Sequence, residues 1–221
     1  MCGRFTLHTP AAQIRESFNL PDLPARELKP RYNIAPSQDV AIIRDTGTGR
    51  EMVMARWGLI PGWSKESRTK YSTINARIES VAEKPTYRTP FKRRRCLIPA
   101  DGFYEWKQDA GNKVPHHIRM QDGKVFAFAG LWDHWEGEGD SIESCTIIVM
   151  PANEVMQPIH ERMPAIIAQQ DYDVWLDSSV TDKQEIMQYL NSVPSIQLTA
   201  YPVSTRVNSA KNNDEGCIRP V

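Results

Sequence analysis

The chain has 221 residues, of which 40% are hydrophobic and 24% are charged, and its formal net charge is zero. This size and composition are typical of one globular domain with a sizeable core, or at most of two small ones. No run of 18 apolar residues occurs, which argues against a membrane-spanning protein. The zero net charge argues against a protein that coats nucleic acid by net positive charge alone.

The charges are distributed unevenly along this neutral chain. Residues 56–95 carry eleven Lys or Arg against three Glu, a net charge of +8, whereas residues 133–185 carry twelve acids against two cations, a net charge of −10. This asymmetry predicts one basic surface that could bind a polyanion locally. A solvated basic loop explains the same charges equally well.

Cys2 directly follows the initiator methionine, and this position distinguishes it from every internal cysteine. Methionine is usually removed when the next residue is small, and the mature chain would then begin with a 1,2-aminothiol. Such an α-amine and thiol have ordinary pKa values of about 8 and about 8.5, so both nucleophiles are available near neutral pH. The amine can condense with an aldehyde to an imine, and the thiolate can then close a thiazolidine ring. The thiol could instead attack an amide, or Cys2 could be an accident of the gene start.

The first half of the chain predicts short elements joined by proline-rich connections. They are a capped helix over 11–18, an extended surface segment over 19–36, a hairpin of strands 40–44 and 51–57, a helix that begins at Asn75 and ends at Pro85, and a strand over 91–99.

The second half predicts mostly strands. They cover 100–106, 114–120, 124–132, 145–150, 165–168 and 196–204, with a polar loop over 136–143, helices near 171–176 and 182–190, and a polar tail. Strands 114–120 and 124–132 are expected to pair across Gln121-Asp122-Gly123, and 145–150 is expected to be central. The whole pattern predicts one α+β domain over residues 1–221.

The remaining cysteines are far apart, with no Cys-x-x-Cys pair and no histidine at metal-ligand spacing. They therefore predict no metal site and no cofactor. Cys96 and Cys145 lie in apolar runs and are expected to be buried thiols of a reduced, cytoplasmic protein. The start of the chain also lacks the apolar core of a secretion signal.

Three polar residues are candidates for proton transfer or substrate contact. Glu105 lies between Tyr104 and Trp106, where apolar surroundings would raise its pKa toward general acid/base use, although a strand glutamate usually faces water. His160 lies in a proline-flanked turn and Asn75 at an expected helix start, where ordinary turn and capping roles compete with catalytic ones.

Six segments in this order resemble one known family, the SRAP family of SOS-response-associated peptidases or abasic-site processing proteins. They are Met1-Cys-Gly-Arg-Phe5, Arg31-Tyr-Asn-Ile-Ala-Pro36, Trp57-Gly-Leu-Ile-Pro61, Asn75-Ala-Arg77, Cys96-Leu-Ile-Pro-Ala100 with Gly102-Phe-Tyr-Glu-Trp106, and His160-Glu-Arg-Met-Pro164. The segments span nearly the whole chain, whose length is similar to that of the compact bacterial members, and no chemical position departs from the pattern.

The resemblance implies a barrel-like core of strands with peripheral helices and a basic channel for single-stranded DNA. It implies that Cys2 forms a thiazolidine with the ring-opened aldehyde of an abasic site, while Asn75, Glu105 and His160 sense, open and hold the sugar. It also implies a set of DNA contacts, at Arg4, Asn33, Trp63, Arg77, Trp106 and Arg162. Among the tryptophans, which are more often core than stacking platforms, loop placement favours Trp63 as a base-stacking residue.

Several alternatives stay open on the sequence alone. Met1 removal is credited in the family to self-cleavage, but a host aminopeptidase would give the same mature chain. An imine at C1′ acidifies C2′, so weak strand cleavage by β-elimination is a plausible side activity. A thiol peptidase or amidohydrolase would use the same Cys2 but needs an oxyanion hole, for which no donor cluster is seen. A non-catalytic reader of single-stranded DNA would use only the basic face and the tryptophans.

Overall fold

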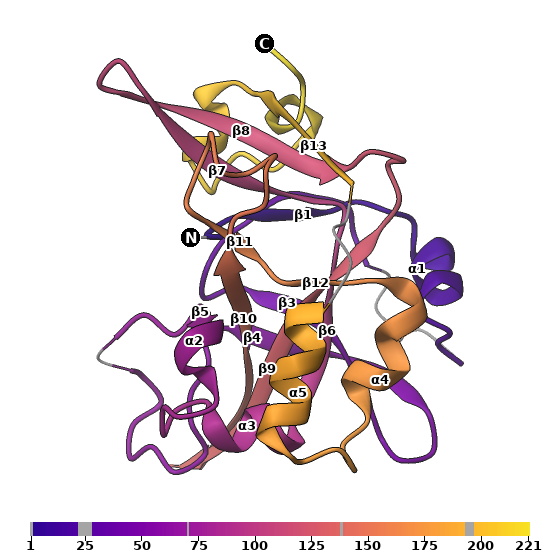
Figure 1. Ribbon diagram of the computed structural model, residues 1–221. Coiled ribbons are helices and arrows are strands. Elements are labelled where there is room, and N and C mark those ends of the chain that lie inside the picture. Colours follow the sequence, from indigo (N-terminus) through magenta and orange to yellow (C-terminus); the bar gives the residue numbers. More distant parts are fainter. Residues whose placement is uncertain (1, 22–27, 70, 138, 193–196) are drawn as a thin grey trace.

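The computed structural model describes residues 2–21, 28–69, 71–137, 139–192 and 197–221. One of its two β-structures is an antiparallel sheet, seen in the upper half of Figure 1. Its strands, in spatial order, are β13 (Leu198–Pro202), β8 (Asn112–Met120), β7 (Gly102–Asp109), β1 (Phe5–Leu7) and β2 (Arg31–Ile34).

The second β-structure is a closed ring of five strands. It consists of β10 (Asp140–Pro151), β4 (Arg50–Trp57), β3 (Asp39–Asp45), β6 (Arg95–Ala100) and β9 (Phe126–Gly137). Each strand pairs with the next in this order, and β9 pairs back to β10, which closes the barrel. Only the β10–β4 pair is parallel within the ring.

Short strands and helices surround the barrel (Figure 1). The short strands are β5 (Asn75–Arg77) and β11 (Arg162–Pro164), which pair with β10, and β12 (Ile166–Ile167), which pairs with β9. The helices are α1 (Ala11–Ser17), α2 (Ile78–Val81), α3 (Arg88–Arg93), α4 (Tyr172–Leu176) and α5 (Lys183–Ser192), with 3₁₀ turns at Gln169–Asp171, Thr205–Asn208 and Glu215–Cys217. The predicted α+β class with a strand-rich barrel-like core is confirmed.

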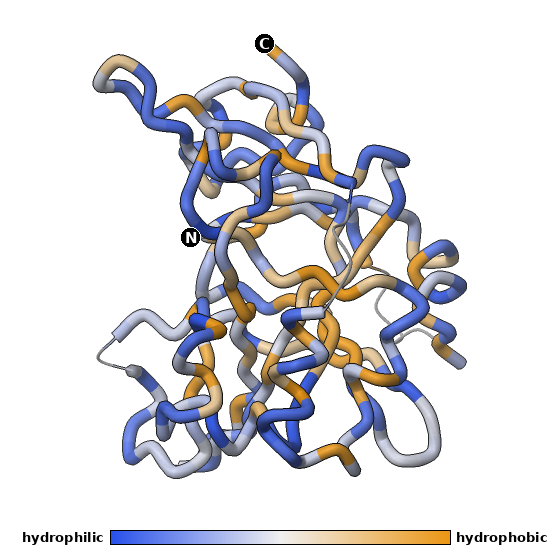
Figure 2. Tube along the Cα trace, viewed as in Figure 1, coloured by the Kyte–Doolittle hydropathy of each residue, from blue (hydrophilic) through white to orange (hydrophobic). Residues whose placement is uncertain are grey.

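The barrel interior is filled by apolar side chains from all its strands. The run 145–149 in β10 is completely buried, as a central strand requires. Gly130 in β9 allows β6 to approach closely, since a Cβ there would lie 2.8 Å from the Cys96 sulfur. Figure 2 shows hydrophobic segments concentrated where the barrel meets the sheet.

Phe5 joins the two β-structures. It lies on β1 of the sheet, yet its ring packs edge-on against Trp57 and Phe128 of the barrel, with centroids 5.1 Å and 5.7 Å away. Such edge-to-face pairs add stability beyond the burial of their area. The segment directly after Cys2 is therefore anchored in the main core.

Some predicted elements are wrong, and each error has a non-local cause. Strands β8 and β9 do not form the expected hairpin: β8 pairs with β7 and β13, while β9 enters the barrel. The residues 126–131 of β9 are all buried, so this strand needs cover on both faces. Asn75 lies in a strand instead of a helix, because β10 offers a free edge at Ile147–Val149.

Other boundaries also differ from the prediction. The region predicted as a strand over 91–99 begins inside α3, and the strand starts only at Arg95. The expected polar loop over 136–143 is wrong, because residues 136–137 belong to β9 and residues 140–143 belong to β10, and the two strands pair there. Residues 31–34 of the extended segment form β2, and residues 22–27 of that segment lie outside the described part of the chain.

Candidate active site around Cys2

Antiparallel pairing of β1 with β7 brings the N-terminus against Glu105. Phe5 is paired with Phe103, and the Tyr104 amide donates to the Arg4 carbonyl at 3.0 Å. If this register is extended from Phe5 toward the N-terminus, Gly3 lies opposite Glu105. Cys2 is the next residue before Gly3. Cys2 is 0% exposed and Glu105 only 3% exposed. A nucleophile and a carboxylate far apart in sequence are thus neighbours in a desolvated setting.

The surroundings of Cys2 hold its thiol in the protonated form. Burial, and then the negative charge of Glu105, raise the pKa of the Cys2 thiol well above its ordinary value. The sulfur lies 3.9 Å from the Arg4 carbonyl oxygen, a weak hydrogen-bond contact. Attack by this sulfur therefore requires a group that removes its proton, and the Glu105 carboxylate is close enough to influence it electrostatically.

Asn75 contacts the backbone of Cys2 from strand β5. Its Nδ2 donates to the Cys2 carbonyl at 2.8 Å, and its own carbonyl accepts from the Tyr87 hydroxyl at 3.4 Å. The Asn75 Oδ1 is buried and has no hydrogen-bond partner among the described residues. A buried acceptor without a hydrogen bond lowers the stability of a protein by about 1–3 kcal/mol. A bound molecule that donates a hydrogen bond to Asn75 Oδ1 would remove this penalty, which favours its binding here.

His160 reaches the same region through β10. It lies two residues before β11, which pairs with β10, and β10 in turn pairs with β5. The His160 Nδ1 accepts the Arg162 backbone N–H at 2.9 Å. The neutral imidazole therefore carries its proton on Nε2, which is the nitrogen that can donate. Direct contacts thus link Cys2 with Asn75, whereas His160 is connected through the strands.

Two of the predicted DNA-contact residues, Arg77 and Arg162, flank one carboxylate. Arg162 donates to Glu79, and Arg77 is exposed at the end of β5. Partial burial opposes ionisation of Glu79, but the hydrogen bond from Arg162 and the charges of both arginines lower its pKa. Sequence reasoning missed Glu79, although its place two residues after the end of the Asn75-Ala-Arg77 segment was a usable signal.

Three others, Arg4, Asn33 and Trp106, are engaged with the C-terminal segment 207–212. Arg4 donates to Asn33 Oδ1 and to the Val207 carbonyl, each at 2.8 Å, and burial lowers the pKa of Arg4. Asn33 is 2% exposed and donates to three carbonyls of this segment. Trp106 Nε1 donates to Asn208 Oδ1 at 2.8 Å. The sequence presented this segment only as a polar tail, without a signal for these contacts.

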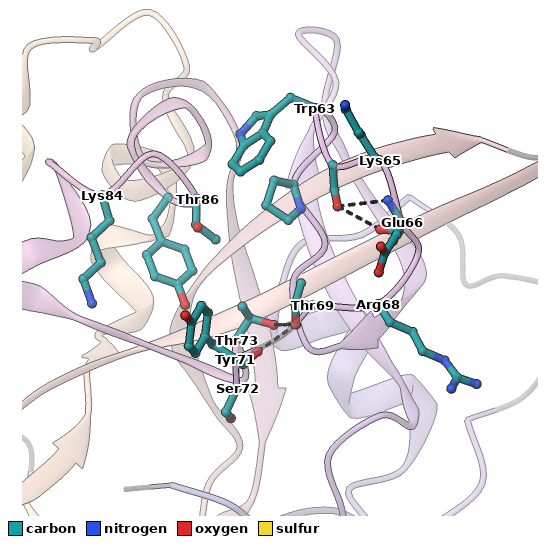
Figure 3. Close-up of a pocket in the computed structure, with 13 residues that line it drawn as sticks. Trp63, Lys65, Glu66, Arg68, Thr69, Tyr71, Ser72, Thr73, Lys84 and Thr86 are labelled. Atoms are coloured by element: carbon teal, nitrogen blue, oxygen red, sulfur yellow. Dashed lines mark hydrogen bonds between the residues drawn. The ribbon is translucent and has the colours of Figure 1, made fainter.

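Trp63, the last predicted contact, is exposed on a loop beside the site. It lines a hollow, referred to below as the aromatic hollow (Figure 3). The residues that line it are Pro61, Trp63, Ser64, Lys65, Glu66, Arg68, Thr69, Tyr71, Ser72, Thr73, Lys84, Thr86 and Tyr87. Within the described ranges, no three His, Cys, Asp or Glu side chains are arranged to hold a metal ion. No helix in those ranges is long and apolar enough to cross a bilayer.

Comparison with known proteins gives a consistent match over the whole chain. The family model described as SOS response associated peptidase (SRAP) matches residues 1–210. The "Abasic site processing protein YoqW" of Bacillus subtilis (strain 168) is 44% identical over 216 residues, covering 96% of each chain.

More distant relatives extend the match. The "Abasic site processing protein HMCES" of Gallus gallus is 30% identical, covering 100% of this chain and 78% of its own. A crystal structure of a Bacteroides thetaiotaomicron protein superimposes with a TM-score of 0.86 at 26% identity, covering 100% of both chains. A family model that matches nearly the entire chain, together with the motif segments and the barrel fold, shows that this chain belongs to the SRAP family.

Proposed function

We propose that this protein processes abasic sites in DNA, and that it caps the lesion in single-stranded DNA through a covalent thiazolidine at Cys2. The observation that carries the proposal is the setting of Cys2, whose carbonyl is held by Asn75 at 2.8 Å while its thiol is buried beside Glu105. The names of the relatives support abasic sites as the target. The ring-opened form of such a site is an aldehyde, which a 1,2-aminothiol traps efficiently.

The α-amine of Cys2 acts first in this mechanism. Because the thiol pKa is raised, the amine is the better nucleophile at neutral pH. It attacks the C1′ aldehyde and, with loss of water, forms an imine. His160 carries a donor proton on Nε2 and transfers protons during opening of the furanose. Asn75 Oδ1, the unpartnered acceptor, receives a hydrogen bond from the amine or from a sugar hydroxyl.

Ring closure follows by addition of the thiol across the imine. The S–C1′ bond forms, the thiol proton passes to Glu105, and Glu105 returns a proton to the imine nitrogen. No oxidant or cofactor is consumed, and the carboxylate ends as it began. The same imine acidifies C2′, so slow β-elimination of the strand is expected as a side reaction.

Removal of Met1 is assigned in this proposal to the protein itself. The Cys2 thiol attacks the Met1 carbonyl, the Cys2 amine leaves, and water hydrolyses the resulting thioester. Mass spectrometry should then find Met1 removed in the wild type and retained in Cys2→Ser.

One gel experiment tests the central claim. The protein is incubated with a single-stranded oligonucleotide that contains an abasic site, or with a matched one that contains a tetrahydrofuran residue, which has no aldehyde. A heat-stable shifted band is expected only with the abasic site. Reversible binding to both oligonucleotides without any adduct would contradict the covalent cap and favour a non-catalytic reader. A duplex carrying the same lesion tests the preference for single strands.

A further inference from the structure

The last stretch of the chain, residues 203–221, lies over one face of the upper sheet, and the proposed reaction uses none of its side chains. It is called the C-terminal clamp below. A bridge between Val203 and Pro220 brings its two ends together. Val203 and Val207 are buried in one cluster with Tyr104 of β7. Figure 1 shows this yellow stretch beside β7 and β8, on the side of the sheet away from the barrel.

The reacting end of the chain lies outside the strands. Strand β1 begins only at Phe5, so Cys2 and Gly3 precede it. Chain ends are poorly ordered unless something ties them down, and glycine restricts the backbone least of all residues. Asn75 holds the Cys2 carbonyl on one side. On the other side, the position of Cys2 depends on what holds Arg4, the residue between Gly3 and β1.

Arg4 is held through both its backbone and its side chain. Its carbonyl accepts the Tyr104 amide at 3.0 Å, which fixes the backbone to β7. Its Nη1 donates to Asn33 Oδ1 and to the Val207 carbonyl, each at 2.8 Å. Its Nη2 donates to the Asn208 carbonyl at 3.2 Å. All three acceptors of the guanidinium are neutral, so this rigid fork fixes a position instead of neutralising a charge.

The clamp is fastened in turn to strand β2. The Asn33 amide nitrogen donates to three carbonyls of the clamp at 2.8–3.1 Å. In the other direction, Asn213 Oδ1 accepts the backbone N–H groups of Tyr32 at 2.7 Å and of Asn33 at 3.1 Å. Arg4, β2 and the clamp therefore form one hydrogen-bonded set. A change at Asn213 would reach Arg4 through this set.

We propose that the C-terminal clamp positions Cys2 for its reaction, and that Arg4 is the positioning residue through which the clamp acts. The clamp holds Arg4, and Arg4 holds the chain two residues after Cys2, so that Cys2 stays between Asn75 and Glu105. The inference rests on the proposed function for the reaction whose rate the clamp sets. Displacement of a reacting group by about 1 Å can lower a rate by roughly 100-fold.

Single-turnover crosslinking to a single strand with an abasic site, at saturating DNA, measures the rate. Arg4→Met removes every donor of the side chain and is expected to slow the reaction by roughly 10- to 100-fold. Asn213→Ala removes two acceptor contacts and should slow it by roughly 2- to 10-fold. Asn213→Asp keeps an acceptor oxygen in place and should restore the wild-type rate. Thr205→Ala, at an exposed position of the same clamp, is the matched control and should react like the wild type.

Binding is measured separately, by anisotropy with the tetrahydrofuran oligonucleotide, which cannot react. Both Asn213 variants are expected to keep the wild-type affinity and the wild-type salt dependence. An unchanged rate for Arg4→Met, with a dependence of log affinity on log salt that is flatter by about 0.7, would make Arg4 a phosphate contact only. That result would overturn the positioning role.

Alkylation of the DNA-free protein by iodoacetamide, mapped by mass spectrometry, tests the clamp without the proposed reaction. Arg4→Met and Asn213→Ala should each raise the alkylation rate of Cys2 by roughly 2- to 10-fold, because local opening becomes easier. Cys96, buried in β6, is the internal reference and should stay protected. Unchanged alkylation of Cys2 in both variants, or equal loss of protection at Cys96, would overturn the inference. A wild-type protein that forms no adduct would instead overturn the proposed function.

Discussion

The region around Cys2 and the aromatic hollow lie next to each other but are built in opposite ways. Cys2 and Glu105 are 0% and 3% exposed; Cys2 lies three residues before β1 and Glu105 lies on β7. Trp63 and Tyr71 are 68% and 83% exposed and are carried by a loop. Covalent chemistry needs reacting groups fixed within a fraction of an ångström in a desolvated place. Recognition of a flexible strand needs exposed rings and cations instead. This division between a buried reacting region and an exposed binding region gives a prediction. Substitutions near Cys2 should change the rate of crosslinking, while substitutions in the aromatic hollow should change the affinity for single-stranded DNA.

The sharpest way to break this division is Cys2→Ser. A hydroxyl does not close a stable ring on the imine, so the heat-stable adduct is expected to disappear completely. The Cys2→Ser variant is also expected to retain Met1, because the proposed self-cleavage uses the Cys2 thiol. Affinity for an intact single strand is expected to stay at the wild-type value, measured by anisotropy. A normal adduct in this variant, or a wild-type chain that keeps Met1 and still crosslinks, would contradict the aminothiol mechanism.

Glu105→Gln is expected to have the next largest effect. The amide keeps the shape of the side chain but cannot carry the thiol proton, so crosslinking should slow by roughly 10²–10⁴-fold, the usual contribution of a general acid/base. Release of a preformed crosslink retraces the same path and should slow as well. The measurement is single-turnover kinetics at saturating DNA, in both directions.

The matched control for this substitution is Glu136→Gln, because Glu136 is exposed at the end of β9. It should react at the wild-type rate. Wild-type rates for Glu105→Gln in both directions would remove Glu105 from the chemistry and leave His160 as the acid/base candidate. Weaker binding with an unchanged rate would instead make Glu105 a DNA-orienting residue.

Asn33→Ala sharpens the comparison, because Asn33 was predicted to contact DNA and yet is buried. The substitution removes hydrogen bonds to three carbonyls of the C-terminal segment and one accepted from Arg4. The free energy of unfolding is expected to fall by about 1–3 kcal/mol, measured by urea denaturation. Asn112→Ala, at the exposed first residue of β8, serves as control. If Asn33→Ala left the free energy of unfolding unchanged but weakened DNA binding, the result would favour a direct contact of Asn33 with DNA.

The sequence made part of the site predictable, because some of the chemistry is local. The place of Cys2 after Met1 and of Glu105 between two aromatic residues could be interpreted without a fold. The strand at Asn75 could not, since it forms only because β10 presents an open edge there. The same holds for β8 and β9, whose short intervening turn predicted a hairpin although burial on both faces draws β9 into the barrel. Long-range pairing was decisive in both cases.

The contacts of Arg4 show a second limit. Its donors are directed to Asn33 and to backbone carbonyls near the C-terminus, and the sequence predicted none of these contacts. The phosphate contact of Arg4 stays a prediction. Backbone acceptors leave no trace in residue identity, so no sequence pattern marks them. The aromatic hollow was also only partly visible, because Trp63 was noticed for its loop position and Tyr71 was not.

The smallest expected effect concerns Glu79, whose carboxylate is paired with Arg162 and lies near Arg77. If Arg162 contacts a DNA phosphate, it must exchange Glu79 for that phosphate, and the carboxylate also repels the approaching strand. Glu79→Gln is therefore expected to strengthen binding of a single strand by up to about fivefold, since a partly exposed ion pair contributes about 0–1 kcal/mol. The dependence of log affinity on log salt should become steeper by up to roughly 0.7, the value of one additional phosphate contact.

Glu83→Gln is the matched control, because Glu83 forms an exposed pair with Lys183 on the adjoining surface. It should change neither the affinity nor the salt dependence. The crosslinking rate of Glu79→Gln at saturating DNA should equal that of the wild type, because the substitution acts on recognition and leaves Cys2 and Glu105 in place. Weaker binding would mean that Glu79 positions Arg162 instead of competing for it. A slower rate at saturation would mean that the basic surface and the buried site are coupled, and the division between them would fail at this point.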